Sequence, residues 1–376
     1  MAEAVVDLGA IAHNTALLAR RSGTPTMAVV KADGYGHGMV PVAETALAHG
    51  ATWLGVTSCA EALALRAAGI TAPILSWLHG AGDDFGPAIA AGVDLSVSSP
   101  LHLRGVAAAA RRVGAVAAVH LKVDTGMARG GAFSSDWDQL LADARALAAG
   151  GVIQVRGVWS HLACADDPGH PSVPHQIARF EEAVAAARAA GLDPPLRHLA
   201  NSAATLDLPE TYYDLVRPGL ALYGVEPTPG IEHGLRPAMT LRAQAILTKR
   251  VPAGTPVSYH HAYATAHAST LVLVPLGYAD GAPRRAGDDG QVWINGVRCP
   301  IAGIVSMDQF VVDAGDTPVA IGDEVLLFGT GERGEPTVVD WARWAGTNPH
   351  EVLTGIGNRV PRGYLPVRAT GKGPQE

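Results

Sequence analysis

Short apolar runs that recur every twenty-odd residues constrain the fold of this chain more than any other feature. Most are separated by alanine-rich stretches with helical spacing, such as "DQLLADARALAAG" and "ARFEEAVAAARAAGL". Strands and helices that alternate eight times predict an α/β fold, a parallel (β/α)8 barrel of TIM type over residues 1–236. The eight runs, between residues 28 and 224, are "AVVKA", "TWLGV", "PILSW", "VDLSVS", "VAAVHLKVD", "IQVRGVWSH", "LRHLAN" and "VRPGLALYG".

The pattern changes after about Pro237, where strand-like runs follow one another without long helices between them. They are rich in β-branched residues and leucine, and glycine or proline marks the turns. The sequence therefore predicts a smaller, mostly-β domain over residues 237–376, with short helices at "DWARWAG" and "PHEVLTGIG". The runs are "TLRAQAILTKRV", "STLVLVPLGYADG", "GQVWINGV", "SMDQFVVDAG" and "DEVLLFG".

Composition and charge exclude several classes of function. Hydrophobic residues make up 48% of the 376 residues, which is ample for a packed core. The net charge of -7 and the lack of a basic run argue against a nucleic-acid or anionic-membrane partner. The sequence has no signal-peptide pattern, and no apolar run approaches the roughly 20 residues of a membrane span. Its three cysteines fit neither a disulfide framework nor a zinc ribbon, so we expect a cytoplasmic protein.

Polar side chains stand at the ends of five predicted barrel strands, where the active site of such a barrel lies. A lone polar residue near a strand end is usually solvated or bonded locally. Five strands together predict a cationic pocket for an anionic ligand, such as a phosphorylated cofactor. The residues are Lys31, Lys122, Asp124, Arg129, His161, His198, Asn201, Ser202 and Arg217.

Lys31 is the most informative of these residues, because a buried strand would be expected to end in an apolar side chain. One interpretation is that the lysine reaches past the strand end into solvent. The other is that a partly dry pocket lowers its pKa and makes it an amine nucleophile. Taken alone, the residue leaves both interpretations open.

Seven motifs in order, from about Ala4 to Tyr364, resemble the alanine racemase family of fold type III pyridoxal-phosphate enzymes. The resemblance implies a barrel with a C-terminal β domain, pyridoxal 5'-phosphate as cofactor and interconversion of L- and D-alanine. It also implies a homodimer with shared active sites and a role in supplying D-alanine for peptidoglycan. The motifs are "AVVKADGYGHG", "LKVDTGMARGG", "HLANSAA", "VRPGLALYG", "VSYHHAY", "LGYADG" and "SMDQF".

The resemblance assigns the two bases that racemisation requires. Lys31 would form the covalent bond to the cofactor aldehyde and then act as a base on one face of the substrate Cα. Tyr259 would be the base on the opposite face, although a phenol is a weak base and needs electrostatic help. In the family these two residues come from different subunits, so the domain over 237–376 would supply Tyr259 and Met307 to the partner's site.

Further residues would hold the cofactor. By resemblance, Arg217 faces the pyridine nitrogen, His198 hydrogen-bonds that arginine and His161 lies near the ring face. Since arginine only donates, the ring nitrogen would stay an acceptor. The remaining contacts would be made to the phosphate by Tyr35, Ser202 and the backbone N–H groups of Gly219 and Leu220, with Asn201 supporting the same wall.

The substrate would be held by Arg129 and by the backbone N–H of Met307, both directed at its carboxylate. In many relatives the matching lysine is carbamylated, which gives a negative group that orients the arginine. Lys122 would orient Arg129 in this way. Tyr278 and Asp280 match residues that line a narrow entrance. We expect no metal site.

Three departures from the family pattern keep alternatives open. Asn358 stands where a tyrosine is frequent, Ile304 replaces an entrance arginine and His260 replaces a glycine. A racemase that also acts on serine is therefore one alternative. A barrel-type decarboxylase is less favoured, because "VSYHHAY" and "SMDQ" argue against it. A non-enzymatic cofactor-binding protein would be a single barrel, and a metal enzyme is disfavoured because His260 and His261 would point to opposite faces of a strand.

Overall fold

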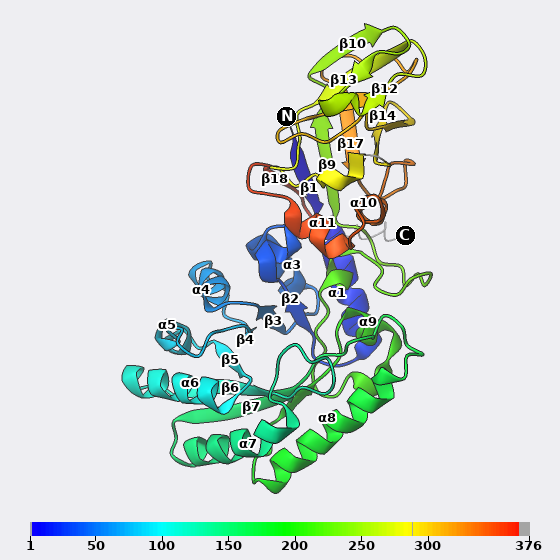
Figure 1. Ribbon diagram of the computed structural model, residues 1–376. Helices are drawn as coiled ribbons and strands as arrows, with labels where there is room; N and C mark the ends of the chain where they lie inside the picture. The colour runs from blue at the N-terminus through cyan, green and yellow to red at the C-terminus, as the bar shows by residue number, and fades with distance from the viewer. Residues whose placement is uncertain (1, 288, 368–376) are drawn as a thin grey trace, which may run out of the picture.

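The barrel domain is built on one curled sheet of seven parallel strands in the order β2 to β8 (Figure 1). The computed structural model describes residues 2–287 and 289–367. The predicted fold class, a barrel followed by a mostly-β domain, is confirmed. The strands are β2 Met27–Val29, β3 Trp53–Val56, β4 Ile74–Ser76, β5 Asp94–Val97, β6 Ala117–Lys122, β7 Ile153–Trp159 and β8 Leu196–His198.

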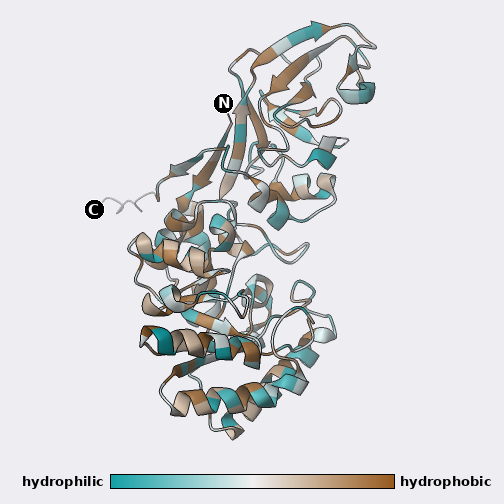
Figure 2. Cartoon of the chain, turned by 60° about the vertical axis from the view of Figure 1, so that its left-hand side comes forward, coloured by the Kyte–Doolittle hydropathy of each residue, from teal (hydrophilic) through white to brown (hydrophobic). Residues whose placement is uncertain are grey.

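Helices connect these strands and cover the sheet, as expected of βα units. In Figure 2 the helices of the lower half carry both hydrophobic and hydrophilic residues, because one face of each packs on the sheet. The helices are α1 Leu8–Ser22, α2 Lys31–Tyr35, α3 Met39–Ala48, α4 Cys59–Ala67, α5 Gly86–Ala90, α6 Pro100–Val113, α7 Ser134–Ala149, α8 Ser172–Ala189 and α9 Ser202–Asp207.

The eighth predicted strand is not a regular strand. Its first residue, Val216, forms one parallel bridge with Thr26. The Met27 N–H donates to the Val216 carbonyl at 2.8 Å, and the Val29 N–H donates to the Pro218 carbonyl at 3.1 Å, so this segment still joins β2. Pro218 has no N–H to continue a ladder, and the chain then turns into the short helix η2 Leu220–Tyr223.

The second domain contains a six-stranded sheet in the order β15-β14-β17-β9-β1-β18, a three-stranded sheet β10-β13-β16 and the pair β11-β12. Both predicted short helices are present as α10 Val338–Ala345 and α11 Pro349–Gly355. The strands are β9 Met239–Gln244, β10 Leu247–Val251, β11 Pro256–Val257, β12 Tyr263–Ala264, β13 Ser269–Val274, β14 Gln291–Ile294, β15 Val297–Pro300, β16 Phe310–Asp313, β17 Glu324–Phe328 and β18 Arg362–Leu365.

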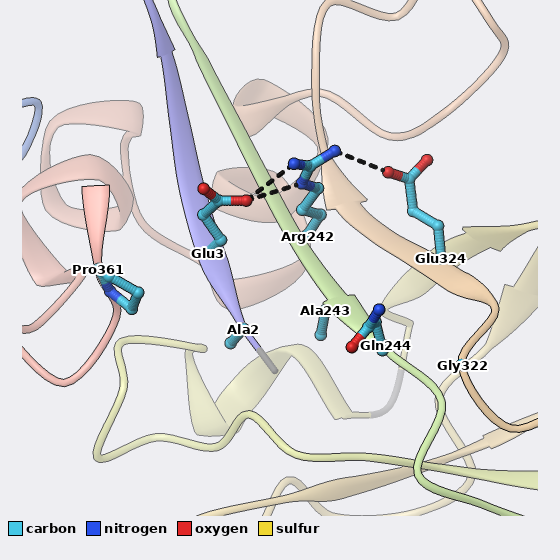
Figure 3. A pocket seen from close by; sticks show the side chains of 8 residues that line it. All are labelled: Ala2, Glu3, Arg242, Ala243, Gln244, Gly322, Glu324 and Pro361. Carbon is cyan, nitrogen blue, oxygen red and sulfur yellow. Dashed lines mark hydrogen bonds and ion pairs between the residues drawn. The ribbon is translucent and has the colours of Figure 1, made fainter. Parts of the chain in front are cut away.

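The first strand of the chain, β1 Glu3–Asp7, lies in this second sheet between β9 and β18. Figure 3 shows how charged side chains join it to its neighbours: Arg242 on β9 contacts Glu3 at 2.8 Å and Glu324 at 3.2 Å. Strand β1 thus belongs to residues that the sequence assigns to the barrel, but its partners lie in the second domain. The division at residues 236 and 237 stays a prediction.

Cys59, Cys164 and Cys299 are free thiols. Within residues 2–287 and 289–367, no helix combines the length and the apolar character needed to cross a membrane. In the same ranges, no group of three or more His, Cys, Asp and Glu side chains is placed to hold a metal ion.

Candidate active site

A cavity of about 710 Å³ opens at the C-terminal ends of the barrel strands. It collects side chains that follow β2, β6, β7 and β8, where a barrel of this type carries its active site. The predicted residues that line it are Lys31, Tyr35, Lys122, Arg129, His161, Asn201, Ser202, Arg217, Gly219 and Leu220.

An unusual turn presents Lys31 to this cavity. Ala32, Asp33, Gly34 and Tyr35 all have positive φ, from 52° to 61°, so the chain makes a left-handed turn directly after the lysine. Non-glycine residues rarely adopt this conformation, and runs of it need support from their surroundings. Glu61 accepts the Ala32 N–H at 2.7 Å, and Asp33 accepts the N–H of residue 39 at 2.8 Å.

Positive charge accumulates around the cavity. Burial and the nearby Arg129 lower the pKa of Lys31. Burial, Arg217 and Arg129 lower the pKa of Lys122 to about 8. Burial and the same cations lower the pKa of His161 to about 3, so this histidine is neutral at physiological pH. An anion in the cavity would stabilise the charged form of each of these groups, and an anion is the ligand class predicted from the sequence.

Arg217 is held rigidly at the wall of the cavity, with only 4% of its surface exposed. Its guanidinium nitrogens lie 3.1 Å from His198 Nδ1, 2.7 Å from the Ser160 carbonyl and 3.2 Å from the Leu199 carbonyl. Burial lowers the pKa of Arg217 to about 9, which leaves it charged at neutral pH. His198 does not line the cavity but is buried behind this arginine.

A narrow cradle lies beside Tyr35. A Cβ atom at position 219 would lie 2.5 Å from the Tyr35 hydroxyl, so a larger residue there would force the tyrosine to shift. The Ser202 hydroxyl oxygen accepts the Gly219 N–H at 2.8 Å and the Ala221 N–H at 3.2 Å. Asn201 caps α9 by accepting the N–H of residue 204 at 3.1 Å. The Gly219 N–H is therefore engaged by Ser202, and the donors that remain for an anion such as phosphate are the hydroxyls of Ser202 and Tyr35.

The predicted residues of the second domain lie elsewhere. Among the described residues, those that line the cavity do not include Tyr259, Tyr278 or Met307. These three side chains are 65%, 42% and 53% exposed, respectively. Figure 1 places β12, which closely follows Tyr259, at the end of the molecule remote from β2. A single subunit therefore does not bring Lys31 and Tyr259 together.

The three exposed residues nevertheless belong to connected loops. The Tyr278 N–H donates to the Ser306 carbonyl at 3.0 Å, next to Met307. Tyr259 and Ser306 line the same shallow pocket, and Ser258 exchanges two hydrogen bonds with the backbone of Ile304. The loops thus present one continuous face.

The remaining residues of interest occupy this same region of the second domain. Asp280 is buried and contacts the Arg359 guanidinium at 3.1 Å. Asn358 is exposed. His260 and His261 lie in the short turn η3 Tyr259–His261 with positive φ, so the expectation that they point to opposite faces of a strand is wrong.

The structure adds two aromatic residues that sequence reasoning missed. The Trp159 ring lies beneath two cations, 4.3 Å from Lys122 Nζ and 4.8 Å from the Arg217 guanidinium carbon. His350, from α11 in the second domain, also lines the cavity, with its ring 5.8 Å from that of Tyr35. Burial and Lys31 lower the pKa of His350. Trp159 directly precedes "SH" at a strand end, which could have drawn attention to it, whereas His350 had no local signal.

Known proteins resemble this chain over nearly its whole length. The family model "Alanine racemase, N-terminal domain" matches residues 6–227, and "Alanine racemase, C-terminal domain" matches residues 238–364. The alanine racemase of Frankia casuarinae is 59% identical over 96% of both chains. That of Salinispora arenicola is 54% identical over 96% of this chain and 98% of its own.

Solved structures agree with these sequence matches. The alanine racemase of D-cycloserine producing Streptomyces lavendulae superposes with a TM-score of 0.96 at 50% identity, over 97% of each chain. The alanine racemase of Streptomyces coelicolor superposes with a TM-score of 0.95 at 50% identity, over 97% of this chain and 98% of its own. Two family models in the right order, and relatives above half identity over almost every residue, show that this chain belongs to the alanine racemase family of enzymes.

Proposed function

We propose that the protein interconverts L- and D-alanine with pyridoxal 5'-phosphate, using Lys31 and Tyr259 as bases on opposite faces of the substrate Cα. The observation that carries this proposal is the cationic cavity in which Lys31 lies with a lowered pKa. A lowered pKa enlarges the neutral fraction of the lysine, and the neutral amine is the form that acts as a nucleophile and base.

The charged and polar residues that line the cavity support the proposed cofactor. The hydroxyls of Tyr35 and Ser202, on either side of Gly219, offer donors for its phosphate. Arg217 supplies a fixed donor for the pyridine nitrogen, and His161 is a neutral ring close to the same cations. The cofactor, held by Lys31 until the substrate amine takes its place, would withdraw electrons from the substrate and so acidify its Cα–H bond, which leaves Lys31 as a free amine.

The residues of the chain then move protons. The Lys31 amine takes the Cα proton on one face, and the Tyr259 hydroxyl delivers a proton to the other, so the product differs only in configuration. The reverse reaction exchanges these two roles. A neutral amine is needed for the first transfer, and the lowered pKa of Lys31 raises its fraction at physiological pH.

We propose that Tyr259 reaches this site from a second subunit of a homodimer. Its 65% exposure and its position outside the Lys31 cavity support this arrangement. A two-fold dimer would form two equivalent sites, each with Lys31 from one subunit and Tyr259 from the other. Met307 would come with Tyr259, because their loops share one face.

Arg129 and the Met307 N–H would bind the substrate carboxylate, and Lys122 would orient Arg129. Tyr278 and Asp280 would line the entrance. Asn358 leaves room for a second activity on serine, which a racemase with a tyrosine at this position would disfavour. We place the enzyme in the cytoplasm as a source of D-alanine for peptidoglycan, in keeping with its free thiols.

The test combines product analysis with cofactor mapping. The protein purified with pyridoxal 5'-phosphate is incubated with L-alanine and with L-serine, and the products are separated on a chiral column. D-alanine without carbon dioxide release supports the proposal, whereas an amine product would instead support a decarboxylase. Borohydride fixation of the cofactor followed by peptide mapping should label Lys31, and a label on another lysine would contradict the assignment.

A further inference from the structure

A buried hydrogen-bond chain runs away from the cavity behind Arg217. Arg217 Nη1 lies 3.1 Å from His198 Nδ1, and His198 Nε2 lies 2.8 Å from His120 Nδ1. His120 Nε2 in turn lies 3.0 Å from Asp94 Oδ2. The chain ends at Arg156, whose Nη1 contacts the other Asp94 oxygen at 3.1 Å.

The barrel interior is shaped around the middle of this chain. His120 and His198 are fully buried, and Asp94 is nearly so. A Cβ atom on Gly157 would lie only 2.4 Å from His120 Nδ1, so a glycine is required beside this ring. The register between β6 and β7 also shifts at His120. The Trp159 ring stacks on His198 with an interplanar angle of 7°.

The donors and acceptors of this chain can be assigned from one end. Arginine only donates, so His198 Nδ1 must accept and carries no proton. The proton of His198 is then on Nε2 and is donated to His120 Nδ1, which must accept. The proton of His120 is therefore on Nε2 and is donated to Asp94, which offers only acceptors when ionised.

The same proton positions follow from the Asp94 end of the chain. A carboxylate that also accepts from Arg156 requires a donor at His120 Nε2, and the same proton positions follow for both rings. An imidazolium at either histidine would place two donors against each other within the chain. Burial, Arg217 and His120 hold the pKa of His198 well below 6.5, which agrees with a neutral ring.

We propose that Asp94 and His120 are positioning residues: they hold the His198 tautomer in which Nδ1 accepts from Arg217, and so orient the guanidinium that faces the cavity. Neither residue lines the cavity, so neither touches the substrate or the cofactor. The catalytic consequence rests on the proposed function, because it assumes that Arg217 faces the cofactor ring. The tautomer assignment does not depend on it.

The first test measures the proton positions directly. Magic-angle-spinning ¹⁵N NMR of histidine-labelled protein distinguishes protonated from unprotonated ring nitrogens. The His120→Asn and His198→Asn variants assign the signals. We expect both rings to be neutral and protonated on Nε2, whether or not the enzyme proves active on alanine. A proton on Nδ1 of either ring, or an imidazolium, would overturn the proposal.

The second test separates the acceptor role of Asp94 from its ion pair with Arg156. Asp94→Leu removes the acceptor, and we expect kcat to fall roughly ten-fold with little change in KM, as for the loss of one buried hydrogen bond. Asp94→Asn keeps an acceptor oxygen, and Arg156→Met removes only the ion pair. In both variants kcat should therefore stay within about three-fold of wild type, and both histidines should stay protonated on Nε2.

The outcomes distinguish the two roles and the two proposals. If Asp94→Asn and Arg156→Met were as inactive as Asp94→Leu, the ion pair with Arg156 would be the interaction that matters. That result would overturn the positioning role. If the wild-type enzyme proved inactive on alanine, the proposed function would fail. The NMR measurement would still confirm or reject the tautomer chain.

Discussion

The ammonium nitrogen of Lys122 lies 4.3 Å from the centre of the Trp159 ring, on the wall of a cavity that also holds Arg217 and Arg129. The negative face of an indole ring attracts a cation, and this attraction partly compensates the repulsion between Lys122 and the two arginines. It does not cancel the repulsion, because burial and these neighbours still lower the pKa of Lys122 to about 8. The ammonium form therefore still dominates at neutral pH, and the free amine dominates above about pH 8.

We expect Lys122 to take up carbon dioxide. Its neutral amine would add CO2 and release a proton, and the carbamate would replace a positive by a negative charge beside Arg129. With ¹³C-bicarbonate at pH 8.5, a carbamate signal should appear in the ¹³C NMR spectrum, and it should vanish in Lys122→Met. A spectrum without this signal, or one unchanged by the substitution, would show that Lys122 stays an amine.

Gly219→Ala should weaken cofactor binding. The added Cβ would lie 2.5 Å from the Tyr35 hydroxyl, so one wall of the cradle must move. We expect the dissociation constant of pyridoxal 5'-phosphate to rise about ten-fold or more, equivalent to one lost hydrogen bond to a charged group. Fluorescence titration measures it. Gly82→Ala is the matched control, because its Cβ would meet no atom within 4 Å.

Tyr223→Phe should destabilise the strand that leads to Lys31. The buried Tyr223 hydroxyl donates to the Val29 carbonyl at 2.9 Å, at the end of β2. Removal of the hydroxyl leaves that carbonyl unpaired in the interior, at a cost of about 1–3 kcal/mol in the free energy of unfolding. Urea denaturation at fixed protein concentration measures the change. Tyr213→Phe, whose hydroxyl meets Glu181 at the surface, should change it by less than about 0.5 kcal/mol.

Local sequence patterns predicted much of the barrel. Seven apolar runs became strands, because a buried parallel strand needs a short continuous apolar segment. The eighth failed at Pro218, whose missing N–H stops the ladder. The place of β1 in the second sheet could not be foreseen, since its partners β9 and β18 lie more than 200 residues away in the chain.

The candidate site was predicted unevenly for similar reasons. Ten predicted residues line one cavity because strand ends converge in a barrel. Asp94 and His120 were missed, because a single polar residue within a strand carries no signal of its partners. His350 was missed because it comes from another domain. The left-handed turn after Lys31 was also not foreseen, as residues such as Ala32 and Tyr35 rarely adopt positive φ.

His233 should make stability depend on pH. Burial lowers its pKa, but the hydrogen bonds to Glu226 and Asp207, both at 2.8 Å, outweigh that effect and raise it above 6.5. A raised pKa stabilises the fold below pH 6.5, and this contribution is lost as the pH rises through the folded-state value. His233→Gln should therefore lower Tm more at pH 6 than at pH 9. An equal loss of Tm at pH 6 and pH 9 would contradict this linkage. So would the same pH dependence in the control His267→Gln, whose histidine is exposed.

The most direct measurement of the central claim is complementation between Lys31→Ala and Tyr259→Phe. Each variant alone should be nearly inactive in converting L- to D-alanine, before and after refolding. When equal amounts are unfolded together and refolded, about half of the dimers are mixed, and in each of these one site carries both lesions and the other carries none. The mixture should therefore recover about a quarter of wild-type activity. If refolded mixed dimers are present but show no activity, Lys31 and Tyr259 do not meet across subunits, and the shared site is contradicted.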